Sequence, residues 1–158
     1  MKTPLFLFLA VALFFGCKKD DANPELDKLP PETQTGANTF GCLVNGTAWI
    51  CDSVSLFKAL TTVIVRGQGK DGSSITITLR GNELNQNETY SLTWISWAQY
   101  SNQCTYHSSD GTGTVTIDKL DETNRIISAR FSFSASNDTC ALKKISITDG
   151  RFDCKYLP

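Results

Sequence analysis

Apolar and polar residues alternate in two neighbouring stretches of the chain, residues 113–118 and 125–133. Alternation with a period of two is the pattern of a strand that has one buried face and one solvated face. A loop of about five residues, 120–124, connects the two stretches and keeps both on the same face. We therefore predict an antiparallel hairpin with a single apolar face, formed by Val115, Ile117, Ile127, Ala129, Phe131 and Phe133.

Further β-rich stretches precede this hairpin. The dipeptide Asn45-Gly46, the strongest two-residue hairpin signal, joins residues 40–44 to residues 47–51. β-Branched and aromatic residues, which favour strands, are then concentrated in three more stretches, namely 53–66, 75–79 and 89–98.

The sequence leaves the strand boundaries open in two stretches, 53–66 and 99–113. The stretch 53–66 is long for one strand, and we expect it to bend or break near Lys58. Residues 99–113 form a long polar connection, with room for a short strand around residues 104–106.

The C-terminal segment contains two apolar sets of opposite parity. Ile145 and Ile147 are odd-numbered, whereas Phe152 and Cys154 are even-numbered. A regular, continuous strand would place the two sets on opposite faces of a sheet. We expect a two-residue hairpin turn at Asp149-Gly150, which returns all four side chains to one face, with a β-bulge there as the alternative.

About eight short strands, hairpin turns and the absence of a convincing long helix predict an all-β fold. Thr, Ser, Ile, Val and aromatic residues are frequent, and the chain contains a single Met. Antiparallel, hairpin-connected strands pack as a β-sandwich or close into a small barrel, and both remain open. Residues 38–158 are long enough to form one domain with its own core.

The N-terminus has the layout of a secretory signal. Lys2 provides a positive charge, residues 5–15 are apolar, and Gly16 precedes Cys17. The segment resembles the lipobox of bacterial lipoproteins, although Phe14 stands where Leu is usual. The resemblance implies that residues 1–16 are removed and that Cys17 is linked to diacylglycerol. An ordinary signal peptide with an incidental cysteine is the alternative.

A polar, proline-containing segment follows Cys17, and it lacks the apolar residues that order a chain. We expect residues 17–37 to be a flexible tether. Its first charged residues, 18–21, resemble the export signal of surface-exposed lipoproteins in Bacteroidetes. This resemblance places the protein in the outer membrane, exposed on the cell surface, and the periplasmic face of that membrane is the alternative.

The charge balance favours neither nucleic acid nor anionic lipid as a partner. Removal of residues 1–16 leaves 14 basic against 16 acidic residues. We expect membrane attachment through the lipid on Cys17 alone. We predict no cofactor, and no metal site, because His107 is the sole histidine and no Cys-x-x-Cys pair occurs. The oligomeric state stays open.

Lipidation of Cys17 would leave an odd number of cysteines, and an exported protein is free to form disulfides. Two bridges and one free thiol are then expected, and the spacing alone does not name the pairs. The five candidates are Cys42, Cys51, Cys104, Cys140 and Cys154.

Several segments resemble a family of Bacteroidetes lipoprotein domains of unknown function: 38–46, 113–117 together with 126–128, and 147–153. The similarity covers residues 38–158 and brings no catalytic residue with it. Cys51 and Cys154 stand where the family usually has other residues. This departure implies a Cys51–Cys154 bridge, with Cys104–Cys140 as the second pair.

Aromatic side chains are crowded into one short region, together with the polar residues Asn102, Gln103 and His107. The aromatic residues are Tyr90, Trp94, Trp97, Tyr100 and Tyr106. Trp94 and Trp97 have opposite parity, so one of them should face outward from a regular strand. An exposed ring beside amide groups can stack on a sugar, and we therefore predict a ligand site at Trp94, Trp97, Tyr100 and Tyr106. The alternative is that these rings fill the core.

The most economical functional hypothesis is a non-enzymatic, lipid-anchored β-domain that binds a glycan or a partner protein. A structural or accessory role in an outer-membrane complex is the alternative. A hydrolase is a remote third hypothesis. His107 lies beside Ser108, Ser109 and Asp110, which are the residue types of a serine triad, but the sequence has no G-x-S-x-G elbow. Ser53, within Asp52-Ser53-Val54, also resembles a bacterial O-glycosylation acceptor.

Overall fold

The computed structural model describes residues 23–81, 84–93 and 97–156. Within these ranges a short 3-10 helix, η1 (Leu26–Lys28), precedes ten strands, and no α-helix occurs. The strands are β1 (Thr39–Val44), β2 (Thr47–Ile50), β3 (Ser53–Ala59), β4 (Thr62–Gln68), β5 (Ser74–Arg80), β6 (Thr89–Ser91), β7 (Trp97–Ser101), β8 (Thr105–Asp121), β9 (Ile126–Ser136) and β10 (Lys144–Lys155). The predicted all-β, antiparallel fold is confirmed.

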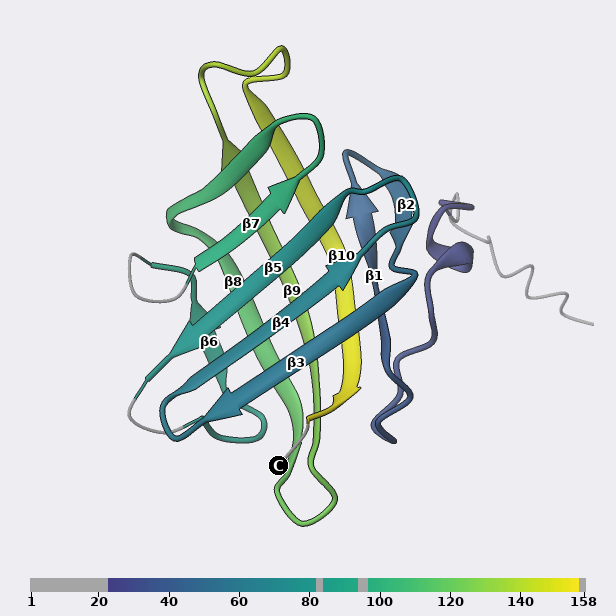
Figure 1. The fold of residues 1–158 in the computed structure, drawn as a ribbon, viewed down its shortest axis with the longest axis vertical. Coiled ribbons are helices and arrows are strands. Elements are labelled where there is room, and N and C mark those ends of the chain that lie inside the picture. Colours follow the sequence, from purple (N-terminus) through teal and green to yellow (C-terminus); the bar gives the residue numbers. More distant parts are fainter. Residues whose placement is uncertain (1–22, 82–83, 94–96, 157–158) are drawn as a thin grey trace, which may run out of the picture.

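The strands form one antiparallel sheet in the order β2-β1-β10-β9-β8-β7-β5-β4-β3, with β6 paired to β8. The sheet curls into a half-barrel, so that β3, β4, β5 and β7 cross in front of β8, β9 and β10 (Figure 1). The last strand, β10, lies between β1 and β9, so the first and last strands of the domain pair with each other. One curled sheet, rather than two separate ones, builds the domain.

The predicted hairpins form where the turn residues indicated. Asn45 and Gly46 connect β1 to β2 with φ values of 50° and 83°, the left-handed pair that a type I′ turn requires. The stretch 53–66 does break, since β3 ends at Ala59 and β4 begins at Thr62. The hairpin of β8 and β9 buries the six predicted apolar side chains, each at most 4 % exposed.

The region around residue 99 differs from the prediction. Residues 89–98 are not one strand, because β6 ends at Ser91 and β7 begins at Trp97. The expected polar connection is largely strand, with β8 starting at Thr105. Its polar side chains misled the prediction, because they mark the solvated face and the rim of the sheet rather than a loop.

The C-terminal segment forms the continuous strand β10 and no hairpin. A bulge between Ile147 and Gly150 interrupts its pairing with β9, and Asp149 adopts a φ of 53°. The bulge brings the two apolar sets to the same face, so Ile147, Phe152 and Cys154 are all buried. The alternative prediction, a β-bulge at Asp149-Gly150, was therefore correct. The segment stays one strand because it pairs with β1 on one side and β9 on the other.

The core fills the concave side of the curled sheet. Phe40 lies at its centre, with its ring 5.9 Å from that of Trp49, 5.1 Å from Phe131 and 6.0 Å from Phe152, between centroids. Full burial of a side chain of this size contributes about 1.5–3 kcal/mol. These rings join strands β1, β2, β9 and β10, which contain the first and last segments of the domain.

Residues 23–37, here called the strap, lie against the outer face of β1 and β10. Leu29 is buried, and Pro30 packs over Gly41, where an added Cβ would come within 2.6 Å of the proline ring. The strap differs from the flexible tether expected for residues 17–37. Residues 17–22 of that tether lie outside the described residues.

Asp153 fastens the strap to β10. Its carboxylate, in a residue 1 % exposed, accepts hydrogen bonds from the backbone N–H groups of Thr35, Gly36 and Ala37 at 2.8–3.1 Å. The Thr33 hydroxyl donates a further hydrogen bond at 2.7 Å. A buried carboxylate with these donors holds a segment that has few apolar residues of its own.

Candidate functional site

The predicted aromatic site is described only at its two tyrosines, and both of these rings are buried. Tyr100 and Tyr106 lie directly opposite each other on β7 and β8 and are only 8 % and 6 % exposed. Their ring centroids are 6.1 Å apart, and both rings join the core. Trp97 lies in β7 but its side chain, like all of Trp94, lies outside the described residues. The two tyrosines therefore do not offer open faces to a sugar.

The same tyrosines nevertheless form the wall of a pocket at one end of the half-barrel, here called the mouth pocket. Its volume is about 270 Å³. Three connections surround it: the β1–β2 turn, the β7–β8 turn and the loop before β10. The side chains that matter most below are Asn45, Tyr100, Asn102, Gln103, Tyr106 and Leu142.

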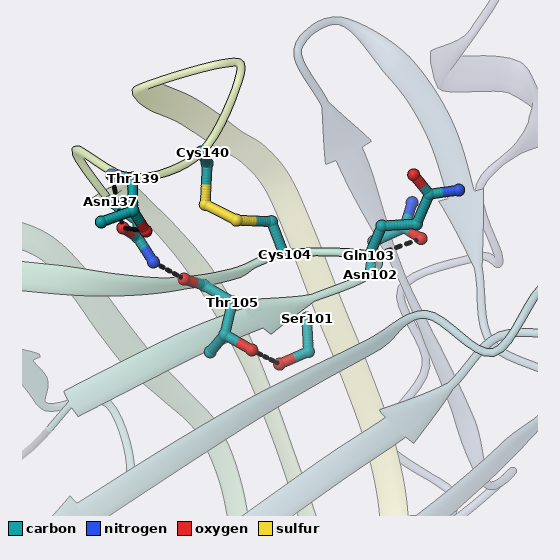
Figure 2. Close-up of a disulfide and its surroundings, with 8 residues drawn as sticks. All are labelled: Ser101, Asn102, Gln103, Cys104, Thr105, Asn137, Thr139 and Cys140. Carbon is teal, nitrogen blue, oxygen red and sulfur yellow. Dashed lines mark hydrogen bonds between the residues drawn. A yellow bond between two sulfur atoms is a disulfide. The ribbon is translucent and has the colours of Figure 1, made fainter.

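A disulfide holds the rim of the mouth pocket. Cys104 in the β7–β8 turn is bonded to Cys140 in the loop before β10, with 6.1 Å between their Cα atoms (Figure 2). Asn137 Nδ2 donates to the carbonyl oxygen of Thr105 at 2.8 Å, which ties the same two segments together. The predicted Cys104–Cys140 pair is thus confirmed, and it fixes two loops that are far apart in sequence.

Amide groups lie at the opening of the mouth pocket. Asn102 Nδ2 donates to the Tyr100 hydroxyl at 3.4 Å, and Asn102 Oδ1 accepts from the Gln103 backbone N–H at 2.7 Å. Burial raises the pKa of Tyr100, so its hydroxyl stays protonated at neutral pH. Leu142, which also lines the pocket, is 60 % exposed.

The described lining of the mouth pocket carries no charged side chain. It combines apolar groups with amide and hydroxyl donors and acceptors, which suits a neutral, polar ligand. Sequence reasoning selected Tyr100 and Tyr106 but missed Asn45, Leu142 and Ile145. Nothing in the local sequence of those three residues indicates a site, because only the fold and the disulfide bring their loops together.

The expected Cys51–Cys154 bridge is absent, since both cysteines are free thiols, as is Cys42. Strand β1 lies between β2, which Cys51 follows, and β10, which contains Cys154. Strands that are not neighbours in a sheet lie about 10 Å apart, whereas disulfides need Cα atoms within about 7 Å. Burial raises the pKa of the Cys154 thiol to about 12, which keeps it protonated and unreactive.

The remaining predicted positions do not assemble into a catalytic centre among the described residues. His107 is exposed on β8, and Ser108 Oγ accepts a hydrogen bond from the backbone N–H of Ala98 at 2.9 Å. The side chains of Ser109 and Asp110 lie outside the described residues. Ser53 is exposed at the start of β3, and Cys17 lies outside the described residues.

Two further properties bear on cofactors and membranes. In residues 23–81, 84–93 and 97–156, no three His, Cys, Asp or Glu side chains come together in a group able to hold a metal ion. In the same part of the chain, no helix has the length and apolar character needed to cross a bilayer.

Comparison with known proteins gives one match. A family model described as a domain of unknown function (DUF6252) matches residues 37–153, which span the sheet from the residues before β1 to Asp153 in β10. No curated protein and no solved structure is significantly similar to the chain.

Proposed function

Because the chain belongs to DUF6252, a family of domains of unknown function, we propose its role from its own residues: a non-enzymatic domain whose mouth pocket binds a neutral glycan. The observation that carries the proposal is the mouth pocket itself, an uncharged hollow of about 270 Å³ with a disulfide across its rim. A site held open in the absence of ligand loses little entropy when the ligand binds.

The size and chemistry of the mouth pocket suit one terminal sugar residue of a glycan. The volume of about 270 Å³ lies just below the range for small-molecule pockets, so the pocket suits a small group. The amides of Asn102 and Gln103 supply paired donors and acceptors for sugar hydroxyls, and Leu142 offers an apolar surface for the C–H face of the ring.

We further propose that the domain is anchored to the outer membrane by a lipid on Cys17 and displayed at the cell surface. The support is the lipobox-like sequence before Cys17 and the charged residues 18–21. Metabolic labelling with palmitate tests the anchor: the full chain is expected to incorporate label and its Cys17→Ser variant is not. Labelling that persists in Cys17→Ser would contradict the anchor.

Affinity electrophoresis in gels that contain immobilised neutral polysaccharides tests the ligand. The full chain should be retarded by at least one polysaccharide, and Gln103→Ala should reduce that retardation several-fold because it removes an amide at the opening. Gln86→Ala is the matched control, since Gln86 contacts the backbone of Leu120 instead. No retardation on any gel, or equal retardation of both variants, would contradict the proposal.

A role as an accessory subunit of an outer-membrane complex is the second candidate, and one observation favours it. Phe57 is 59 % exposed on the edge strand β3, and Leu60 is 97 % exposed in the turn that follows. Partner proteins commonly dock against exposed apolar side chains and against the open edge of a sheet. If this role is correct, Phe57→Ser with Leu60→Ser should abolish a reproducible crosslink to one envelope protein.

A further inference from the structure

Two arginines lie side by side on the outer face of the half-barrel, away from the mouth pocket. Arg130 on β9 and Arg151 on β10 are directly opposite each other in the strand pairing. Like charges in such a pair repel, so each arginine needs a compensating partner. Asp118 accepts hydrogen bonds from Nε and Nη2 of Arg130 at 2.8–3.2 Å. Glu32 of the strap accepts from Arg151 Nη1 at 3.3 Å.

These arginines line an open hollow of about 750 Å³ between the strap and the sheet, here called the arginine cleft. Its floor is a set of hydroxyl groups from three adjacent strands, contributed by Thr114, Thr116, Ser132 and Thr148. Asp149 also lines the hollow, so Glu32 is not its only carboxylate. A smaller hollow of about 260 Å³ shares Glu32, Arg130 and Arg151 with it. The two hollows therefore form one continuous polar surface centred on the arginine pair.

Two buried polar atoms in the smaller hollow have no hydrogen-bond partner among the described residues: Ser128 Oγ and Arg151 Nε. Ser128 is only 2 % exposed, and it borders the hollow next to the arginine pair. Buried donors in folded proteins are normally satisfied, so these two atoms have a hydrogen-bonding capacity that the described residues do not use.

The contact between Glu32 and Arg151 is the weak member of the charge network. The Glu32 side chain is 61 % exposed, and its single hydrogen bond of 3.3 Å is long for a charged pair. Arg130, by contrast, is fixed by three contacts with Asp118. A carboxylate that arrives from outside can therefore compete with Glu32 for Arg151.

We propose that the arginine cleft binds a carboxylate-bearing saccharide. The sugar carboxylate takes the place of Glu32 between Arg130 and Arg151, and the sugar hydroxyls contact the row of Thr and Ser hydroxyls on the floor. A single carboxylate matches the charge that Glu32 now supplies, and a polyol matches the hydroxyl-lined floor. The site is separate from the mouth pocket and does not depend on the function proposed for it.

Isothermal titration of the full chain with hexagalacturonate tests this proposal, with maltohexaose as the neutral probe. The acidic probe should bind, and any binding of the neutral probe should be unaffected by Arg130→Gln. Arg130→Gln should weaken the binding of hexagalacturonate at least tenfold. Arg66→Gln, the same change on β4 outside the cleft, should leave it unchanged. Equal affinities of these two variants, or no binding by the full chain, would overturn the proposal.

Glu32→Gln provides a second test in a variant that should fold normally, because this side chain is largely exposed. The change removes the internal carboxylate that competes for Arg151, so hexagalacturonate should bind several-fold more tightly. Unchanged or weaker binding would mean that Glu32 is not a competitor and would overturn the proposed displacement. Gln103→Ala at the mouth pocket should have no effect, which separates the two sites.

Discussion

Asp153 is the residue on which attachment of the strap depends. Burial alone would raise the pKa of this carboxyl group. The hydrogen bonds from Thr33, Thr35, Ala37 and Gly36 outweigh burial and hold the pKa below its ordinary value. The Asp153 carboxyl group is therefore ionised in the folded protein at neutral pH.

We expect Asp153→Asn to lower the free energy of unfolding by about 2 kcal/mol, because the amide accepts hydrogen bonds less strongly than the carboxylate and one of its two ends cannot accept. Urea denaturation at pH 7 measures this loss. Asp138→Asn, a change at an exposed aspartate, is the control and should be neutral within error. A neutral Asp153→Asn would mean that the strap is held by other contacts.

The same carboxyl group makes the stability depend on pH. Its pKa is lower in the folded chain, so its contribution is complete above the unfolded value of about 4 and is lost as the pH falls through the folded value. The difference between the parent chain and Asp153→Asn should therefore shrink when the denaturation is repeated below pH 4. A constant difference from pH 7 to pH 3 would contradict this explanation.

At the scale of elements, the bulge in β10 depends on close contact between Gly150 and the ring of Phe131. A Cβ added at Gly150 would lie 2.3 Å from that ring. Gly150→Ala should destabilise the domain by about 2 kcal/mol through overpacking, measured by urea denaturation. The cost should fall when Phe131→Leu is present as well. An equal cost in both backgrounds would show that the contact is not responsible.

The disulfide at the mouth pocket closes a loop with a sequence separation of 36 residues. Chain entropy predicts that Cys104→Ser with Cys140→Ser lowers the free energy of unfolding by about 3–4 kcal/mol. Cys51→Ser, which changes a free thiol, should have a much smaller effect. Thermal denaturation of the three proteins under oxidising conditions makes the comparison. A large loss in Cys51→Ser would indicate a bridge at Cys51.

The hairpins were predictable because their signals are local. Asn45-Gly46 specifies its own turn, and the alternation in β8 and β9 specifies its own face. Asp149-Gly150 fits a turn and a bulge equally well, and only the pairing of β10 with β1 and β9 decides between them. The local sequence likewise could not reveal that the curled sheet buries Tyr100 and Tyr106.

At the scale of the whole molecule, the strap changes the reach of the proposed lipid anchor. Twenty extended residues could hold a domain about 60 Å from the lipid. The strap begins at residue 23 on the domain, so only five residues, 18–22, separate it from Cys17. The six steps from Cys17 to residue 23 span at most about 22 Å. If Cys17 carries the lipid, the domain therefore lies close to the membrane surface.

The whole molecule presents two candidate sites of different chemistry. The mouth pocket is uncharged and lies between loops at one end of the half-barrel. The arginine cleft is charged and lies on the outer face beside the strap. Neither site could be read in full from the sequence, because the mouth pocket joins three separate loops and the arginine cleft joins the strap to adjacent strands.

The central claim is that the mouth pocket binds a neutral glycan. The most direct measurement is the change in amide chemical shifts when a retained glycan is titrated into the isotope-labelled full chain. We predict that shifts are concentrated at Tyr100, Asn102, Gln103, Tyr106 and Leu142. Saturable shifts confined to other parts of the sheet, or no shifts at saturating glycan, would contradict the claim.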